Sequence, residues 1–157
     1  MENRMELTFS ACPQNEAFAR VAVAAFAVQL SPTLGEMADI KTAVSEAVTN
    51  AIVHGYRDLP TDPAHTVRLK AVLCERRVLM VTVSDDGVGI DDVPKAMQPF
   101  YSTGDELERS GMGFCVMQTF MDAVEVDSAP GKGTTVTMRK YIAAPAKALP
   151  TPAAVRA

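Results

Sequence analysis

The sequence predicts an α+β fold with a mostly antiparallel sheet, and three observations support this prediction. Two segments with helical spacing of apolar residues come first, at residues 16–30 and 36–54. Two pairs of alternating apolar and polar segments follow, at residues 66–85 and 124–142, each joined by a short turn. A third helical segment, residues 113–123, lies between the pairs. Because a short turn reverses the chain, both pairs are expected to be antiparallel hairpins.

Length and composition predict one domain with a sizeable core. The chain has 157 residues, 48% of them hydrophobic, and a formal net charge of -4. We expect one domain over residues 1–142 and a disordered, low-complexity tail over residues 143–157. The acidic balance argues against direct binding of nucleic acid or of an anionic membrane, since both require a basic surface.

The chain is expected to be cytoplasmic. Its longest apolar run, residues 21–28, is too short to span a bilayer, and its first ten residues lack the apolar core of a signal peptide. The cysteines are scattered and form no CxxC pair, which is typical of reduced thiols: Cys12, Cys74 and Cys115.

Residues 5–10 alternate in polarity and predict a short strand. Asn15 is expected to cap the first helix, residues 16–30. That helix is apolar nearly all round, which is typical of a helix packed on two sides, with the core on one side and a partner on the other. Arg20 is the lone charge between Glu16 and the end of this helix, so it is either a snorkelling side chain or a partner contact.

The second helix, residues 36–54, is expected to end at Gly55. It carries Glu46, Asn50 and His54 at a spacing of four, so these side chains share one face. Spacing alone leaves three interpretations open: a solvated helix face, a metal site, or the working edge of an enzyme.

The strand over residues 77–85 has Asp85 at its end, and Gly87 and Gly89 follow. Glycines permit a positive φ and close approach of a ligand, although Asp-Gly is also common in simple turns. A buried aspartate needs a hydrogen-bond donor, and an adenine 6-amino group is a suitable one. Calcium binding is the alternative for this stretch, but its acidic residues do not follow an EF-hand pattern.

The connection over residues 86–113 is long, polar and dotted with glycine, which is typical of a functional lid. A short helix is expected within it at residues 92–97. Gly111 and Gly113 lie where the third helix begins, and the free N–H groups of a helix start suit phosphate. Arg109 can add charge-assisted contacts to terminal phosphate oxygens. The alternative is a flexible loop that ends in a helix.

Two common nucleotide motifs do not fit. The stretch "APGKGTT" contains Gly-Lys, but Val126 stands where a Walker loop requires its first glycine. Gly111 and Gly113 are followed by Val116 rather than by a third glycine, so the Rossmann fingerprint fails as well.

The order of these features resembles the Bergerat ATP-binding fold of the GHKL superfamily, which includes gyrase, heat-shock-90 chaperones, mismatch-repair ATPases and sensor histidine kinases. The stretches "MELTFSACPQNEAFARV", "IKTAVSEAVTNAIVHGY", "ELERSGMGF" and "GTT" are similar to the sporulation anti-sigma F factors, a family of small serine kinases. The resemblance covers about residues 4–141 and departs at Gly104 and Asp105, where a lysine and a proline are expected. It implies a two-layer α+β sandwich, with helices on one face of a mixed, mostly antiparallel sheet.

The resemblance also implies roles for individual residues. Glu46 matches the general base toward a serine hydroxyl, and Asn50 matches the ligand of Mg²⁺. Asp85 matches the aspartate that binds adenine. The other implied ATP contacts are Gly87, Gly89, Arg109, Gly111, Gly113 and Thr134. Arg20 matches a residue that contacts the sigma factor, and no role is carried over for His54.

The implied function is that of an ATP- and Mg²⁺-dependent protein serine kinase and anti-sigma factor. Such a protein forms a homodimer, sequesters sigma F from RNA polymerase, and phosphorylates its anti-anti-sigma antagonist. The alternatives are a related kinase that regulates a stress sigma factor, and a nucleotide-binding module without kinase activity. A sensor histidine kinase or a gyrase-type ATPase is expected to need a further domain.

Overall fold

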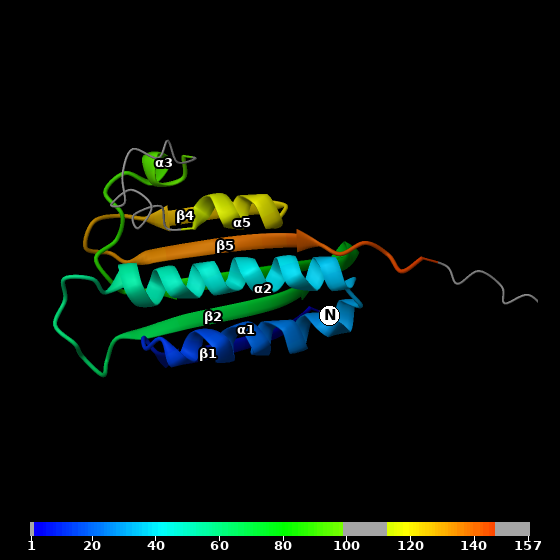
Figure 1. Cartoon of the computed structure of the whole chain (residues 1–157), viewed down its shortest axis with the longest axis horizontal. Helices are drawn as coiled ribbons and strands as arrows, with labels where there is room; N and C mark the ends of the chain where they lie inside the picture. Colours follow the sequence, from blue (N-terminus) through cyan, green and yellow to red (C-terminus); the bar gives the residue numbers. More distant parts are fainter. Residues whose placement is uncertain (1, 99–112, 147–157) are drawn as a thin grey trace, which may run out of the picture.

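The computed structural model describes residues 2–98 and 113–146, which build a five-stranded sheet (Figure 1). The strand order is β1-β2-β3-β5-β4. The strands are β1 (Asn3–Ser10), β2 (Thr66–Cys74), β3 (Val78–Asp85), β4 (Ala123–Ser128) and β5 (Thr134–Tyr141). All four neighbouring pairs are antiparallel, so the described sheet lacks the parallel pair that a mixed sheet would contain. Both predicted hairpins are present.

Three helices lie side by side on one face of this sheet (Figure 1). They are α1 (Gln14–Ala27), α2 (Leu34–Thr49) and α5 (Phe114–Phe120). Helix α2 occupies the middle and contacts both of the others. The two-layer α+β sandwich expected from the sequence is therefore confirmed.

Alternation along the strands explains why one face is covered and the other open. Every second residue of β3 is buried, and the last of these is Asp85. The intervening positions face away from the helices, and two of them, Thr82 and Ser84, carry hydroxyl contacts, such as that of Ser84 with Thr135 at 3.0 Å. On the same face Lys70 and Glu6 form an ion pair at 4.0 Å. Apolar residues on one face and polar residues on the other are what a half-covered antiparallel sheet requires.

Small and branched side chains of α2 form the centre of the core. The buried residues of this helix are Ile40, Ala43, Val44, Ala47 and Val48. They meet buried residues of the two central strands, Val81 and Val83 of β3 and Val136 and Met138 of β5. The alanines allow α2 to lie close to the sheet. Its last turn is therefore held firmly over the ends of β3 and β5.

The first helix begins differently from the prediction. Helix α1 starts at Gln14, and Pro13 occupies the N-cap position without a capping side chain. Asn15 is inside the helix, and its Nδ2 donates to the Ser10 carbonyl at 2.9 Å and to Cys12 Sγ at 3.2 Å. The prediction that Asn15 caps the helix is wrong, because Pro13 presets a helical φ and the amide is used to fix the end of β1.

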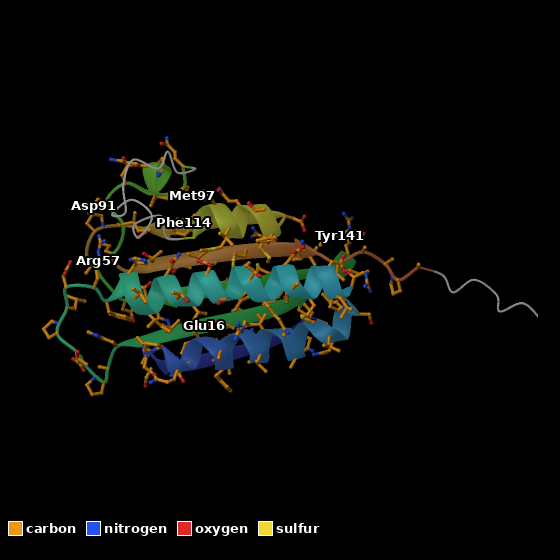
Figure 2. All side chains as sticks on the ribbon, in the orientation of Figure 1. Glu16, Arg57, Asp91, Met97, Phe114 and Tyr141 are labelled. Carbon is orange, nitrogen blue, oxygen red and sulfur yellow. The ribbon has the colours of Figure 1, made fainter. Side chains whose placement is uncertain are left out.

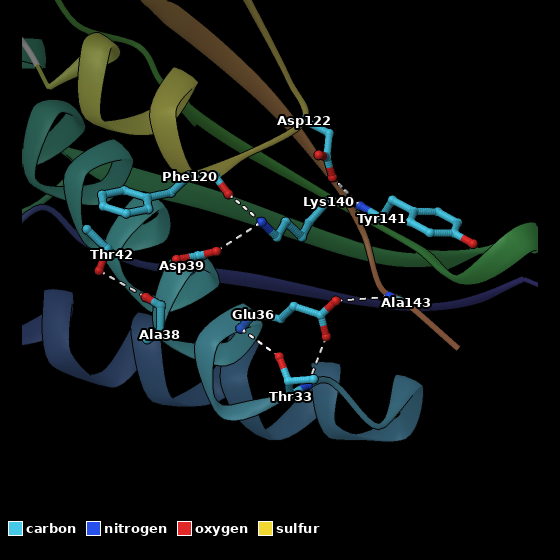
Figure 3. Close-up of polar contacts among 10 residues, drawn as sticks. All are labelled: Thr33, Glu36, Ala38, Asp39, Thr42, Phe120, Asp122, Lys140, Tyr141 and Ala143. Carbon is cyan, nitrogen blue, oxygen red and sulfur yellow. Dashed lines mark hydrogen bonds and ion pairs between the residues drawn. The ribbon is translucent and has the colours of Figure 1, made fainter. Parts of the chain in front are cut away.

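The second helix begins two residues earlier than predicted, at Leu34, because a capping box precedes it. Thr33 Oγ1 accepts from Glu36 N at 3.1 Å, and Glu36 Oε2 accepts from Thr33 N at 2.8 Å (Figure 3). The other carboxylate oxygen of Glu36 accepts from Ala143 N at 3.0 Å. These backbone donors, Ala143 first, hold the pKa of Glu36 below its usual value.

Helix α2 does not continue to His54 as a regular α-helix. It ends at Thr49, and the π-helical turn η2 (Asn50–Gly55) follows directly. The predicted α-helix up to Gly55 is therefore wrong in its last turn: Gly55 is the last residue of the π-helical turn, and Tyr56 is its C-cap. A wider turn at a helix end is a frequent feature of functional sites.

Three short elements complete the part of the chain that the structure describes. They are η1 (Val28–Leu30), η3 (Glu75–Arg77) and α3 (Val93–Ala96), the last lying inside the expected range 92–97. Residues 143–146 belong to no helix or strand. Across residues 2–98 and 113–146, no helix has both the length and the apolar character that a membrane crossing demands.

Candidate functional site

A pocket lies where the last turn of α2 and η2 meet the ends of β3 and β5. Its lining residues are Ala47, Asn50, Ala51, His54, Gly55, Arg57, Val83, Asp85, Gly89, Ile90, Phe114, Thr134 and Val136. Four residues that the sequence predicts as ATP contacts meet here, although they are far apart in the chain: Asn50, Asp85, Gly89 and Thr134. Figure 2 shows Arg57 and Phe114 at the loop end of the molecule, where this pocket lies.

Asp85 is the buried charged residue of the pocket. Its side chain closes β3 and the residue is 6% exposed. Burial raises the pKa of Asp85 to about 6, and the N–H groups of Gly87 and Thr134 oppose this shift by hydrogen bonding to the carboxylate. The Gly87 N–H donates to Asp85 Oδ1 at 2.9 Å. The carboxylate is thus oriented by the backbone and keeps acceptor capacity toward the pocket.

Close approach of two backbone segments explains the glycine at position 87. The Gly55 carbonyl accepts from Val88 N at 2.7 Å, so the end of η2 lies directly on the turn after β3. A Cβ at Gly87 would lie 1.6 Å from the Gly55 oxygen, and a Cβ at Gly55 would lie 2.7 Å from the Asp85 carboxyl carbon. Glycine at both positions therefore brings η2 against Asp85.

Glu46 and Gly113 lie against each other at the side of the pocket. Gly113 has a φ of +62° and forms the N-cap of α5, as expected for a glycine that opens a helix. A Cβ at Gly113 would lie 2.2 Å from Glu46 Oε2. Gly113, at the start of α5, therefore lies directly against the Glu46 carboxylate.

A groove adjoins Glu46 on the side of α1. Its lining residues are Arg20, Lys41, Thr42, Ser45 and Glu46. Arg20 pairs with Glu16 at 3.7 Å, and Glu16 accepts from Ser45 Oγ at 2.5 Å, so α1 and α2 are linked along this groove. The sequence did not predict that Arg20 and Glu46 share one surface. Glu46 lines the groove while Asn50, one turn later, lines the pocket.

His54 lines the pocket, although sequence reasoning gave it no role. Burial, and then the charge of Arg57, lower the pKa of His54, which favours a neutral imidazole there. Among the described residues, no three His, Cys, Asp or Glu side chains gather where they could hold a metal ion. Of the three residues on the Glu46, Asn50 and His54 face, Asn50 and His54 line the pocket, whereas Glu46 lines the adjoining groove.

Several pocket residues escaped the sequence prediction. They are Arg57 and the apolar wall of Val83, Ile90, Phe114 and Val136. A signal for two of them exists: Val83 lies two residues before Asp85, and Val136 two residues after Thr134. Alternate residues of a strand share a face. Arg109 and Gly111, also predicted for this site, lie outside the described residues.

Comparisons with known proteins agree with this architecture. Residues 9–140 match the family described as the histidine kinase-like ATPase domain. An anti-sigma F factor from Thermoanaerobacter pseudethanolicus is 56% identical over 140 residues, covering 89% of this chain and 94% of that protein. Anti-sigma F factors from Geobacillus kaustophilus and Clostridium perfringens (strain SM101) are 55% and 53% identical, covering 91% and 89% of this chain and 95% and 97% of their own.

Solved structures share the fold at lower identity. The RsbU and RsbW domains of Rv1364c from Mycobacterium tuberculosis superpose with a TM-score of 0.62 at 19% identity, covering 92% of this chain and 34% of that one. The histidine kinase domain of a blue-light activated kinase from Erythrobacter litoralis gives a TM-score of 0.52 at 21% identity, covering 81% of this chain and 60% of that one. The chain belongs to the anti-sigma F factor family, within the histidine kinase-like ATPase domain proteins.

Proposed function

We propose that the chain, as a single domain over residues 1–142, is an ATP- and Mg²⁺-dependent protein serine kinase that also acts as an anti-sigma factor. It would sequester sigma F and phosphorylate the anti-anti-sigma antagonist of that complex on a serine. The proposal depends on one observation. The buried carboxylate of Asp85 lies in a pocket that Asn50 also lines, and Glu46 lies one helical turn before Asn50.

The pocket fits an adenine nucleotide. Asp85 is 6% exposed and its carboxylate is oriented by backbone N–H groups, so a ligand amino group would satisfy it. Val83, Ile90, Phe114 and Val136 supply apolar walls for a purine ring. Gly87 and Gly89 allow the turn after β3 to pass close by, and Thr134 adds a second polar group.

The groups around Asn50 fit the phosphates and their metal. The Asn50 amide oxygen would hold Mg²⁺, which accepts one protein ligand alongside phosphates and water. Gly113, at the start of α5, would lie along the phosphates, and the family resemblance adds Gly111 and Arg109. When bound, ATP and Mg²⁺ supply the transferable phosphoryl group and neutralise its charge.

Glu46 would act as the general base. Its carboxylate lines the groove, so a serine hydroxyl entering along α1 and α2 meets it before reaching the pocket. Glu46 would orient that hydroxyl and accept its proton as the oxygen attacks. The groove also carries Arg20 and Lys41, two cations suited to an acidic partner segment.

The outer face of α1 supports protein partners. Phe18 and Val21 are 55% and 60% exposed, and Val28, just beyond α1, is 58% exposed. Such an apolar stripe is typical of an interaction surface. We propose that sigma F, through Arg20, and a second copy of the chain use this side of the molecule.

The proposed kinase activity is tested with radiolabelled ATP. The assay measures transfer of phosphate to the antagonist protein, with and without sigma factor. Glu46→Gln should bind ATP with nearly unchanged affinity yet lose phosphotransfer by at least about 100-fold, since a general base contributes that much or more. Glu6→Gln, on the open face of the sheet, is the matched control and should keep full activity. Transfer at the wild-type rate by Glu46→Gln would disprove the assignment of the base.

Two alternatives give different outcomes in the same assay. A kinase that regulates a stress sigma factor would phosphorylate a different antagonist and would not be affected by sigma F. A nucleotide-binding module without kinase activity would bind ATP but transfer no phosphate to either antagonist. The relatives named anti-sigma F factor favour the proposed anti-sigma F kinase over both alternatives.

A further inference from the structure

Ser128 lies behind the pocket and touches it through Thr134. It is the last residue of β4 and pairs in register with Thr134, the first residue of β5. Thr134 lines the pocket, whereas Ser128 is not among the lining residues. The two hydroxyl oxygens are 2.9 Å apart, close enough for a hydrogen bond in either direction.

Two further contacts of Ser128 decide the direction of that bond. Ser128 Oγ accepts from Ile90 N at 2.9 Å and donates to the Gly133 carbonyl at 2.8 Å. A serine hydroxyl has one proton, and a carbonyl oxygen can only accept. The proton of Ser128 is therefore committed to Gly133, and Thr134 must donate its own proton to Ser128. The Thr134 oxygen is left with lone pairs and no proton for the pocket.

The groups that fix this arrangement also hold Asp85. Gly133 N donates to the Gly87 carbonyl at 3.0 Å, and Gly131 N donates to the Val88 carbonyl at 2.7 Å. A Cβ at Gly133 would lie 2.0 Å from the Asp85 backbone oxygen. The turn after β3 and the turn before β5 are thus one closely packed unit. Ser128, Thr134 and Asp85 keep their relative positions because of it.

We propose that Ser128 is a positioning residue that makes Thr134 an obligate hydrogen-bond acceptor and thereby sets the base specificity of the pocket. With Asp85 as a carboxylate, both polar groups accept, so a ligand edge that contacts them directly must donate. A 6-amino purine meets this requirement. A 6-oxo purine presents an acceptor and is rejected, because a buried acceptor facing an acceptor has no partner. The inference rests on the proposed nucleotide-binding function.

The test compares ATP with inosine triphosphate, which carries an oxygen in place of the 6-amino group. Calorimetric titration of the wild type and of Ser128→Ala gives the ratio of the two affinities. In Ser128→Ala the Thr134 hydroxyl can rotate and donate, so the preference for ATP should fall by about fivefold or more. The ratio is the readout, because loss of the Ile90 N–H acceptor can weaken both nucleotides equally.

Matched variants separate positioning from a general structural effect. Thr135→Ala removes a neighbouring hydroxyl pair, with Ser84 at 3.0 Å on the open face, and should leave the ratio unchanged. Ser128→Thr keeps the hydroxyl and should restore the wild-type ratio. Thr134→Val should lower the ratio as Ser128→Ala does. The double variant Ser128→Ala/Thr134→Val should then have the same affinity ratio as Thr134→Val alone, since Ser128 acts through Thr134.

The outcomes are distinct. Equal weakening of both nucleotides by Ser128→Ala, or a double variant with the two effects added, overturns the positioning role while leaving ATP binding intact. If Ser128→Ala does not fold, Ser128→Thr and Thr134→Val still decide: an unchanged ratio in Thr134→Val overturns the inference. A wild-type protein that binds neither nucleotide overturns the proposed function itself, and the inference with it.

Discussion

Asp85 combines two requirements that oppose each other. As a ligand acceptor it has to be charged, and as a residue that is 6% exposed it is stabilised by being neutral. In the protein without ligand, burial is the larger effect and raises the pKa of Asp85 from 3.8 to about 6. The residue therefore stores a destabilisation of the folded chain at neutral pH, as functional sites often do.

This destabilisation predicts an unusual pH dependence for Asp85→Asn. Because the folded-state pKa is raised, the stability contributed by Asp85 is present below pH 3.8 and lost as pH rises through about 6. Without ligand, Asp85→Asn should exceed the wild type in free energy of unfolding at pH 8, by on the order of 3 kcal/mol at most. Urea unfolding should show this gap growing from pH 5 to pH 8. A gap that narrows with rising pH would contradict it; exposed Asp127→Asn is the control.

The same substitution should have the opposite effect on nucleotide binding. The amide that replaces the carboxylate can donate as well as accept, and it lacks the charge that strengthens a hydrogen bond from a 6-amino group. We expect ATP affinity at pH 7.5 to fall about tenfold or more, because hydrogen bonds to charged groups contribute about 1.5–3 kcal/mol. Isothermal titration measures this directly. Unchanged affinity would remove Asp85 from the base-binding role.

At the scale of elements, the helix that carries Glu46 and Asn50 is fixed at both ends by backbone chemistry. Its start is a capping box at Thr33 and Glu36, and its end is the π-helical turn that finishes at Gly55. The cap and the pocket are at opposite ends of α2, so they can be varied separately. We expect substitutions at the capped start of α2 to change stability, and substitutions at its pocket end to change the candidate chemistry.

Thr33→Ala tests this separation. It removes the acceptor of Glu36 N and should lower the free energy of unfolding by about 1 kcal/mol. ATP affinity should stay within about twofold of the wild type, since Ala47, the pocket residue of α2, lies about four turns away. Chemical denaturation and calorimetry together give both values. Thr119→Ala, which removes a hydroxyl bonded to Cys115 O inside α5, controls for loss of a threonine without loss of a cap.

Element types were predictable because their signals are local. Alternation identified β2 and β3, and helical spacing identified α1 and α2. The errors lie where another hydrogen-bond partner or a long-range contact competes with the local signal. Asn15 has the chemistry of an N-cap, but it bonds to the end of β1 instead. The π-helical turn η2 bonds to the turn after β3, a long-range contact that helical periodicity does not record.

At the scale of the molecule, the site exists because segments distant in sequence converge. Asn50 and Asp85 were each singled out from their own local motif, and the family resemblance joined them and added Thr134. The groove that brings Arg20 beside Glu46 could not be predicted, because it depends on how α1 packs on α2. The same holds for Ser128, whose role depends on the register of β4 against β5.

A similar long-range contact holds the two layers together at the other end of α2 (Figure 3). Lys140 of β5 donates to Asp39 of α2 at 3.1 Å and to the Phe120 carbonyl at the end of α5 at 2.7 Å. Its side chain is 12% exposed, so one ammonium group satisfies a carboxylate and a helix end in a largely buried position. This single residue therefore connects the sheet with α2 and α5, two of the helices that cover it.

We expect Lys140→Met to lower the free energy of unfolding by about 1–3 kcal/mol, because it leaves Asp39 and the Phe120 carbonyl without this donor. Lys70→Met is the matched control: it removes an exposed ion pair at 4.0 Å and should cost less than about 1 kcal/mol. ATP affinity should be nearly unchanged in both variants, since neither residue lines the pocket. Urea denaturation measures the first effect and calorimetry the second. If Lys140→Met is fully folded and still loses ATP affinity, then the contacts of Lys140 affect the pocket. The two ends of α2 would then not be independent.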